Sequence, residues 1–293
     1  MKDVDLLLSG GYVVVSSSQV ITNGAVAIAG DRVVEVGPTE QVTKAVRAAR
    51  TIDTTGKAVM PGLINAHNHT CQSTARGLAD DIPVTEWLSR IVPFEATLLE
   101  EDVRASVRLA CVEMIKSGTT GVMEGCATPG HENTVGEVFV ESGLRGVLTR
   151  STMEHADTTW TVPPSFLISR EDNLKATEAM LERWNGAGDG RISAWPSFRH
   201  AQDVSDELII DLVKLMDDYN VGFHGHQSTR SSGELSHLDD LGVLHPNMVF
   251  AHGIRYSRRE LELIRAIGIK INHNPGGSSM GHTAPRRSAT SPR

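Results

Sequence analysis

The sequence has few cysteines, no long apolar run and no block of charges of one sign. Its three cysteines (Cys71, Cys111 and Cys126) form no CxxC pair, so we expect free thiols in a reducing cytoplasm rather than disulfides or a zinc knuckle. No apolar run approaches the ~18 residues of a membrane span. Acidic residues exceed basic ones by 36 to 28, which argues against nucleic-acid or anionic-membrane partners because these require a basic patch. The N-terminus, MKDVDLLLSGG, has acids where an export signal carries basic residues, so no export signal is expected.

Residues 1–56 have the composition of β-hairpins. The apolar runs LLLSGGYVVV and AVAIAGDRVVEVG contain a Gly-Gly and a Gly-Asp pair, which are typical of turns between short strands. A closed sheet needs more strands than this stretch supplies. We therefore expect residues 1–56 to form part of a small β-sandwich that other residues complete.

From residue 57 onward, strand patterns alternate with helical ones. The candidate strands are 58–69, 118–125, 144–151, 191–198, 221–228, 247–254 and 268–275. The candidate helices are 99–118, 205–220 and 257–268, with Ser205 as an N-cap and Gly268 as a stop. Alternation of this kind implies a parallel sheet, and repeated units of this size predict an α/β fold of the (β/α)8 TIM-barrel type over residues 57–285.

Only seven barrel strands can be counted in the sequence. Residues 286–293, RRSATSPR, have no large apolar residue and no periodicity. We therefore expect an incomplete barrel, followed by a frayed tail or by a stretch in which the chain was cut short or changed reading frame near Pro285. An open barrel edge would also favour aggregation or association into homo-oligomers.

Histidines occur at the ends of several predicted strands. His67 and His69 are two residues apart, so their side chains point to the same face of the first barrel strand. At the C-terminal mouth of a barrel this face lines the lumen, where two imidazoles can bind a divalent metal. Histidines also end or follow four later strands: His200, His226, His252 and His273. This recurrence predicts a metal centre, with His224 as an alternative ligand to His226 because the two share a face.

A series of motifs resembles the amidohydrolase superfamily, and more narrowly its aminohydrolases that act on purine nucleosides, cytosine and s-triazines. The motifs, in order, are VMPGLINAHNHT, RGLADDIPVTEWL, SRIVPFE, SGTTGVMEG, LTRS, AHG and NHNP. The resemblance runs from about Asp5 to Pro285. It implies a metal-dependent (β/α)8 barrel and a β-sandwich built from both ends of the chain.

The resemblance also implies roles for individual histidines. It makes His67, His69 and His226 the metal ligands, with zinc as the expected ion and iron as the alternative. It makes His252 the catalytic residue that orients the attacking water or polarises the substrate. It gives His200 a catalytic and substrate-contacting position.

Three further residues match the substrate pocket of the nucleoside-deaminase branch. They are Trp87 in EWL, Glu95 in PFE and Arg150 in LTR. Each has a plain structural alternative, because pocket residues vary most within a fold. Trp87 would serve helix packing, Glu95 would be a first-turn acid and Arg150 would form a surface ion pair.

Two departures from the family pattern bear on activity. Family deaminases carry a carboxylate three residues after the fifth-strand histidine, where this chain has Thr229, and a hydroxyl does not exchange protons at neutral pH as a carboxylate does. Glu234 or a water molecule would have to replace it, although the spacing of Glu234 does not suit a direct exchange. The family's eighth strand ends in a metal-binding aspartate, and no acid follows Pro285. We therefore expect weak metal binding and slow turnover or none.

Two classes of function follow. The first is a metal-dependent hydrolase, deaminase-like, that attacks a C–N bond of a small nitrogen heterocycle with metal-activated water. The second is a truncated or frameshifted inactive fragment, or a pseudoenzyme. Hydrolytic dechlorination is a variant of the first class because the carboxylate position is altered. In either hydrolase the expected partner is a small heterocyclic substrate.

Overall fold

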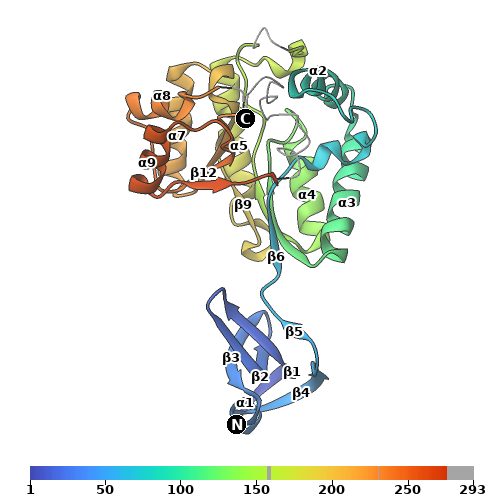
Figure 1. Cartoon of the computed structure of the whole chain (residues 1–293). Helices are drawn as coiled ribbons and strands as arrows, with labels where there is room; N and C mark the ends of the chain where they lie inside the picture. Colours follow the sequence, from blue (N-terminus) through green and yellow to red (C-terminus); the bar gives the residue numbers. More distant parts are fainter. Residues whose placement is uncertain (157–159, 230, 276–293) are drawn as a thin grey trace, which may run out of the picture. The chain divides into compact units, whose positions relative to one another are not determined.

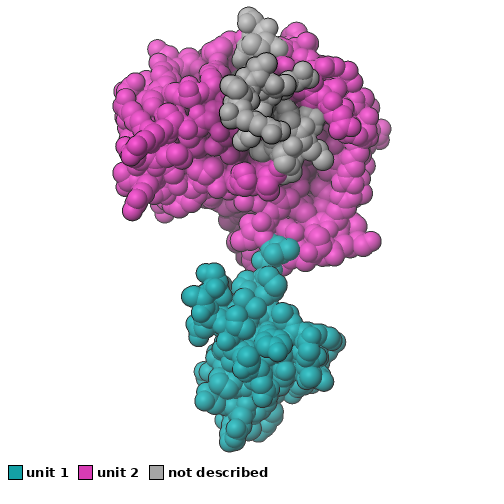
Figure 2. Space-filling view, viewed as in Figure 1, with its two compact units in different colours: residues 1–63 teal, residues 64–293 magenta. Residues whose placement is uncertain are grey.

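A computed structural model describes residues 1–156, 160–229 and 231–275 of the chain (Figure 1). The chain divides into two compact units, Met1–Leu63 and Ile64–Arg293, which Figure 2 colours separately. The expectation for the tail at 286–293 lies outside the described residues.

The first unit contains a five-stranded sheet. Its strands are β1 (Lys2–Ser16), β2 (Gln19–Ala29), β3 (Arg32–Pro38), β4 (Val46–Asp53) and β5 (Ala58–Val59), and α1 (Thr39–Ala45) precedes β4. The order is β3-β2-β1-β4, with β5 also on β1. Strand β1 is antiparallel to β2 and parallel to β4 and β5. A second layer of the predicted sandwich stays a prediction.

One predicted turn in this unit was wrong. Gly10 and Gly11 lie inside the long strand β1, where the register to β2 shifts, and Gly10 has a φ of 94°. A Cβ atom at Gly11 would lie 2.6 Å from the carbonyl oxygen of Thr54. The glycine pair therefore marks an irregularity and a close backbone approach inside a strand, which glycine in a strand also signals.

The second unit contains the predicted parallel strands, arranged in two four-stranded sheets. The first sheet is β6 (Leu63–Asn68), β7 (Thr119–Glu124), β8 (Arg145–Leu148) and β9 (Ile192–Ala194). The second is β10 (Ser197–His200), β11 (Phe223–Gln227), β12 (Met248–His252) and β13 (Lys270–Asn272). The pairs from β7 to β9 and from β10 to β13 are parallel. Each of the seven predicted ranges therefore contains a strand, but the first and the fourth are divided. In the range 58–69, Ala58–Val59 is β5 of the first unit's sheet and only Leu63–Asn68 belongs to this unit's sheets.

The division of the fourth strand joins the two sheets. Trp195 donates its backbone N–H to Leu148 of β8, and the carbonyl of Pro196 accepts from His224 of β11. Proline has no N–H to continue the first ladder, so the chain changes partner there. At the far edges Asn272 of β13 donates a side-chain hydrogen bond to the carbonyl of Ala66 in β6.

Helices lie outside these strands: Figure 1 shows α3 and α4 beside the first sheet and α7, α8 and α9 beside the second. Their bounds are α2 (Val84–Glu95), α3 (Glu100–Lys116), α4 (Glu132–Ser142), α5 (Arg170–Trp184), α6 (Ala187–Gly190), α7 (Asp206–Asp218), α8 (Glu234–Asp240) and α9 (Arg258–Ile267), with short 3-10 turns η1 (Thr70–Ala75), η2 (Pro164–Phe166) and η3 (Ala201–Asp203). The three predicted helices are confirmed as α3, α7 and α9. The Ser205 hydroxyl accepts from the N–H of Leu208, and Gly268 ends α9 with a φ of 85°. Within the described ranges, no helix has both the length and the apolar character for crossing a bilayer.

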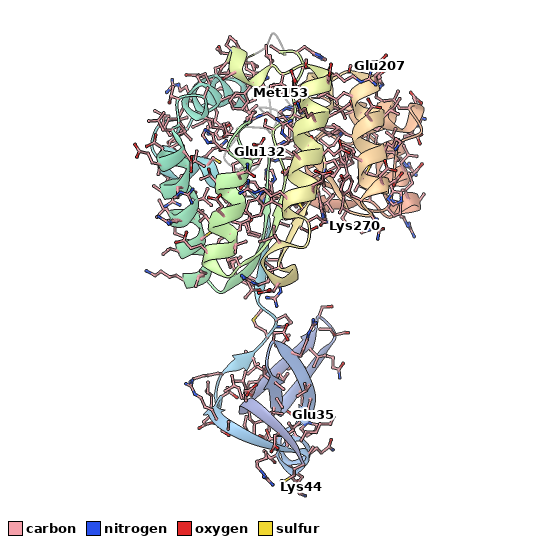
Figure 3. All side chains as sticks on the ribbon, turned by 180° about the vertical axis from the view of Figure 1, so that it is seen from behind. Glu35, Lys44, Glu132, Met153, Glu207 and Lys270 are labelled. Carbon is pink, nitrogen blue, oxygen red and sulfur yellow. The ribbon has the colours of Figure 1, made fainter. Side chains whose placement is uncertain are left out.

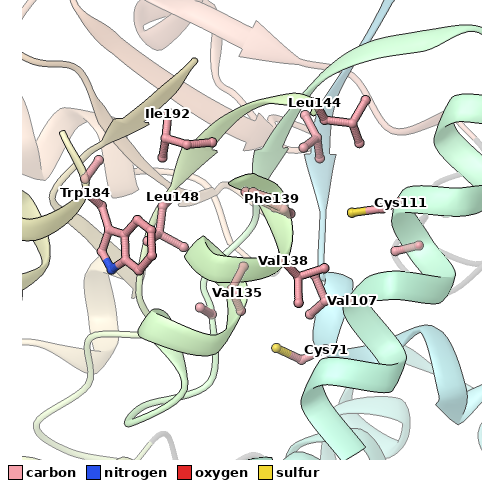
Figure 4. Packing of buried hydrophobic residues seen from close by; sticks show 14 of the residues in the cluster. Cys71, Val107, Cys111, Val135, Val138, Phe139, Leu144, Leu148, Trp184 and Ile192 are labelled. Atoms are coloured by element: carbon pink, nitrogen blue, oxygen red, sulfur yellow. The ribbon is translucent and has the colours of Figure 1, made fainter. Parts of the chain in front are cut away.

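The core beneath the first sheet is closely packed. Figure 4 shows Val107 of α3 beside Val138 and Phe139 of α4, and all three side chains are buried. Gly146 of β8 faces this layer, and a Cβ atom there would lie 2.5 Å from Cδ2 of Phe139. The sheet therefore approaches α4 where the strand has no side chain.

We expect Gly146→Ala to destabilise the second unit by about 1–3 kcal/mol, because the added methyl group overpacks the core against Phe139. Gly121→Ala in β7 is the matched control, since its Cβ would meet no atom closer than 3.8 Å. Its effect should stay within about 0.5 kcal/mol. Urea unfolding followed by tryptophan fluorescence measures both, and equal effects would contradict the packing argument.

Candidate metal centre

Two histidines leave the end of β6 together. His67 lies in the strand and His69 follows it as the N-cap of η1. Their ring centroids are 4.9 Å apart with the planes nearly perpendicular. The predicted placement of both side chains on one face is confirmed.

Three more histidines reach this place from the second sheet. The backbone register pairs His200 of β10 with His226 of β11, and Gln227 with His252 of β12. The His226 ring lies 4.9 Å from that of His67 and 5.1 Å from that of His69, and the His252 ring lies 5.2 Å from that of His67. Nitrogen atoms of His67, His226 and His252 all lie within 4.8 Å of one another. The five histidines predicted for the site are therefore brought together.

The nitrogen atoms of His69 and His226 face each other. Their Nε2 atoms are 3.0 Å apart, and Nδ1 of His226 donates to the carbonyl oxygen of Arg199 at 2.7 Å. A neutral imidazole that donates through Nδ1 has its lone pair on Nε2. Two nitrogens that share a tetrahedral zinc at about 2.0–2.1 Å lie roughly 3.3 Å apart. The observed pair is close to that spacing.

Burial keeps these rings neutral. Removal from water is the largest cause that holds the pKa of His67, His69 and His226 well below the usual value, and neighbouring charges add to it. For His252, burial lowers the pKa to about 4. Only a neutral imidazole offers the lone pair that a metal ion requires, so the cluster is in its metal-binding form at neutral pH.

His224 lies deeper on the same face of β11. Its Nε2 is 3.3 Å from Nδ1 of His67, and its Nδ1 donates to the carbonyl of Val249 in β12 at 2.7 Å. Its side chain is fully buried. The structure therefore places the alternative ligand within reach of His67, at the floor of the cluster.

His252 and His200 each have a partner that defines which ring nitrogen carries the proton. Nδ2 of Asn274 lies 3.1 Å from Nδ1 of His252, so Nδ1 accepts and Nε2 carries the hydrogen. Nδ1 of His200 lies 2.9 Å from Oδ2 of the buried Asp203 and donates to it, which leaves Nε2 as the acceptor. Nε2 of His252 is therefore a hydrogen-bond donor, whereas Nε2 of His200 is an acceptor.

A cavity of about 590 Å³ opens over the histidines. Trp87, Arg199, His200 and Thr229 are among the side chains that line it. The predicted pocket position of Trp87 agrees with this geometry.

Two residues predicted for the pocket lie behind its wall. Glu95 is 2% exposed and accepts hydrogen bonds from Gln72 and Arg199. Arg150 is also buried, and its guanidinium donates to Glu132, which Figure 3 labels, and to Asn173. Neither side chain is part of the described cavity lining. The expectation that Arg150 contacts substrate directly is therefore corrected, because Glu132 and Asn173 occupy its hydrogen-bonding groups.

The altered carboxylate position also has a defined environment. Thr229 lines the cavity, and its buried hydroxyl has no hydrogen-bond partner in the described part of the chain. Glu234 instead accepts from the backbone N–H of Ser228 at 2.8 Å and from the hydroxyl of Ser231, and it does not belong to the cavity lining. The geometry does not favour Glu234 as a replacement for the family carboxylate.

Sequence reasoning missed four side chains around the site. Gln72, Arg199, Asp203 and Asn274 all touch the cavity or a histidine that lines it. Three of them had a local signal: Arg199 directly precedes His200, Asp203 follows His200 by three residues, and Asn274 lies in the NHNP motif. The hydrogen bonds of Gln72 and Arg199 to Glu95 and of Asn274 to His252 are tertiary contacts, which the sequence alone does not indicate.

Parallel strands that carry imidazoles at their carboxyl ends are typical of α/β metalloenzymes. The chain belongs to the amidohydrolase family, whose profile matches residues 58–284. The predicted family is therefore confirmed.

Individual proteins are similar over most of this chain. The 5-methylthioadenosine/S-adenosylhomocysteine deaminase of Syntrophobacter fumaroxidans is 33% identical over 283 residues, which cover 92% of this chain and 62% of that relative. The solved adenosine deaminase of Xanthomonas campestris with bound zinc gives a TM-score of 0.83 at 24% identity, covering 97% of this chain and 65% of that one. The atrazine chlorohydrolase of Arthrobacter aurescens complexed with zinc gives 0.78 at 19% identity, covering 94% and 67%. The solved structures show the shared fold.

We expect His226→Asn to weaken Zn²⁺ binding at least about a hundredfold, because it removes the lone pair whose direction the Arg199 carbonyl fixes. His237→Asn is the matched control, since that side chain is half exposed and pairs with Asp206. Calorimetric titration of chelator-treated protein measures both affinities. Equal affinities in the two variants would contradict the assigned ligand.

Glu124, at the end of β7, should make the protein less stable as the pH rises. It is fully buried, and burial raises its pKa from 4.5 to about 8. Between these two pKa values the folded chain holds a proton that the unfolded chain releases. The contribution of Glu124 to stability is therefore largest at low pH, and it declines as the pH rises from 4.5 to about 8. Between pH 6.5 and 8 we expect the stability of the natural chain relative to Glu124→Gln to fall by up to about 1.4 kcal/mol per pH unit.

The measurement is urea unfolding in the presence of a chelator. Histidines with lowered pKa values change stability in the opposite direction up to about pH 7.5, and the comparison with Glu124→Gln cancels their contribution. Parallel pH profiles for the natural chain and Glu124→Gln would refute a raised pKa for Glu124.

Proposed function

We propose that this protein is a metal-dependent hydrolase that removes an amino group from a small nitrogen heterocycle. The observation that carries this proposal is the convergence of neutral imidazoles from β6 and β11 at one end of the cavity. Membership of the amidohydrolase family supports it, and so does the activity for which the similar deaminase of Syntrophobacter fumaroxidans is named. The expectation of an inactive fragment gains no support from a family match over residues 58–284.

The donor set fits a divalent cation. His67, His69 and His226 would hold it, with zinc as the first expectation, iron as the alternative ion and His224 as the alternative ligand. Three imidazoles suffice for zinc in other enzymes. A cation bound there would supply Lewis-acid activation of water, whose pKa it lowers from 15.7 toward about 7.

The protein's own groups would handle the protons and the ring. His252 presents Nε2–H and can donate to a ring nitrogen or to an oxygen of the substrate, because Asn274 occupies its Nδ1. His200 presents an acceptor Nε2, and Asp203 stabilises the imidazolium that forms when it takes a proton. The two histidines together would carry out the proton transfer, because the hydroxyl of Thr229 is unsuited to it.

Trp87, Glu95 and Arg150 would act at different depths. The indole of Trp87 offers an apolar wall for a planar heterocycle. Glu95 would act through its two partners in the cavity wall, Gln72 and Arg199. Arg150 would position the wall from behind it.

Hydrolytic dechlorination is the second candidate, and Thr229 is the observation that favours it. An amine leaves as ammonia only after it is protonated, whereas chloride leaves as an anion without a proton. A cavity with a hydroxyl at this position is therefore better suited to chloride than one that contains a carboxylate. The zinc-bound atrazine chlorohydrolase has the same fold.

The test is product analysis with protein reloaded with Zn²⁺ or Fe²⁺ after chelator treatment. We expect ammonia release from at least one aminopurine, aminopyrimidine or aminotriazine, at a rate at least about a hundredfold above that of the stripped protein. Chloride release from a chlorotriazine without ammonia release from any amine would favour the second candidate. Full metal loading with neither product would refute both.

A further inference from the structure

A second histidine of β11, His224, lies one layer below the cluster. It shares a face with His226, because side chains two residues apart on a strand point the same way. Its side chain is fully buried. Its Nδ1 lies 2.7 Å from the carbonyl oxygen of Val249 in β12, and its Nε2 lies 3.3 Å from Nδ1 of His67. Both ring nitrogens of His224 therefore have a partner inside the protein.

These two contacts define where His224 carries its hydrogen. Neither a carbonyl nor a second imidazole supplies the negative charge that a buried imidazolium requires, so the ring is neutral. A carbonyl oxygen only accepts hydrogen bonds, so the single hydrogen of the neutral ring is on Nδ1, which donates to Val249. Nε2 of His224 therefore presents a lone pair to His67.

The lone pair of His224 in turn defines where His67 carries its hydrogen. Two lone pairs that face each other at 3.3 Å repel, whereas an N–H that faces a lone pair forms a hydrogen bond. His67 therefore carries its hydrogen on Nδ1 and its lone pair on Nε2. A nitrogen of His67 lies within 4.8 Å of nitrogens of His226 and His252. Since His224 occupies Nδ1 of His67, the nitrogen that is available to a cation is Nε2.

The same geometry argues against His224 as a ligand of that cation. The lone pair of a ligand points at the metal ion, whereas the lone pair of His224 points at an N–H of another histidine. A His224 ring that turned toward the cation would break its hydrogen bond to Val249. It would also leave Nδ1–H of His67 without an acceptor, and burial makes such a loss costly.

We propose that His224 is a positioning residue of the metal centre, which fixes the tautomer and the ring orientation of His67 so that Nε2 of His67 faces the cation. The inference rests on the proposed function in taking His67 as a metal ligand, and it assigns His224 to hold that ligand instead of replacing one. A hydrogen bond to the distal nitrogen of a ligating imidazole also raises the basicity of the nitrogen that binds the metal. His224 therefore strengthens metal binding without touching the ion.

The first experiment locates the hydrogens in the natural full chain. Two-dimensional NMR of protein with ¹⁵N-labelled histidine distinguishes a ring nitrogen that carries a hydrogen from one that carries a lone pair. Variants of His67 and His224 assign the signals. Before Zn²⁺ is added, we expect a hydrogen on Nδ1 of both rings. After addition, the Nε2 signal of His67 should move to the position of a metal-bound nitrogen, and that of His224 should remain at the position of a hydrogen-bond acceptor.

The second experiment measures Zn²⁺ affinity by competition with a chromogenic chelator. His224→Leu should weaken binding about tenfold to a hundredfold, because it removes the acceptor that holds His67. His224→Gln is the conservative variant, since its amide oxygen can accept at the position of Nε2 and should restore most of the affinity. Phe223→Leu is the matched control, because Phe223 is a buried core residue on the opposite face of β11. It should lower stability and leave the affinity unchanged.

The NMR result would overturn the proposal if the hydrogen of His67 were on Nε2, or if Nε2 of His224 took the position of a metal-bound nitrogen. The affinities would overturn it if folded His224→Leu bound Zn²⁺ as tightly as the natural chain, or if Phe223→Leu or His224→Gln weakened binding as much as His224→Leu. Absence of Zn²⁺ binding by the natural chain would overturn it as well. Thermal melting verifies folding, and if His224→Leu does not fold, the NMR of the natural chain decides.

These outcomes are distinct from failure of the proposed function, because neither experiment depends on turnover. The expected tautomers and affinities without ammonia release would support the inference and overturn the deaminase assignment. Ammonia release by a chain whose His67 carries its hydrogen on Nε2 would do the reverse.

Discussion

The site depends on hydrogen bonds from imidazole N–H groups to the backbone of neighbouring strands. Strand β11 lies between β10 and β12. His226 donates to the carbonyl of Arg199 in β10, and His224 donates to that of Val249 in β12, both at 2.7 Å. Each bond fixes one tautomer and turns Nε2 toward His69 or His67. The parallel register, which is a property of the fold, therefore decides the direction of the lone pairs that a metal would use.

Charge balance follows from this arrangement. The possible metal ligands that converge in the described residues are imidazoles, which are neutral in the folded chain. A divalent cation would add two positive charges beside the guanidinium of Arg199. Glu95 offsets part of this charge from behind the wall.

Much of the fold could be predicted because its signals are local. Alternating apolar runs gave the seven parallel strands, and caps such as Ser205 and Gly268 gave helix ends. The errors arose where one local signal has two structural meanings. The pair Gly10–Gly11 is compatible with a turn or with an irregular strand, and only the approach of the Thr54 carbonyl decides between them.

The site shows the same limit more strongly. The spacing of His67 and His69 fixes their common face within one strand, so their proximity could be predicted. The pairing of Glu95 with Arg199 joins residues 104 positions apart. The partners of Arg150 are Glu132 of α4 and Asn173 of α5, which only the tertiary fold brings to the end of β8. Periodicity carries no information about such contacts. Resemblance placed Glu95 and Arg150 in the right region, but their hydrogen-bond partners, which decide what they can do, required the three-dimensional structure.

The backbone directly after β7 also packs against the two histidines at the end of β6. A Cβ atom at Gly125 would lie 2.6 Å from Cε1 of His67 and 3.2 Å from Cε1 of His69. Both rings therefore pack on bare backbone, which is less mobile than a side chain. The next residue, Cys126, has a φ of 96°, a conformation that costs a non-glycine residue of order 1–3 kcal/mol. Cys126 directly follows the glycine against which the two rings pack. The absence of a side chain at Gly125 thus leaves room for both rings, and the strained backbone of Cys126 is an energetic cost directly beside them.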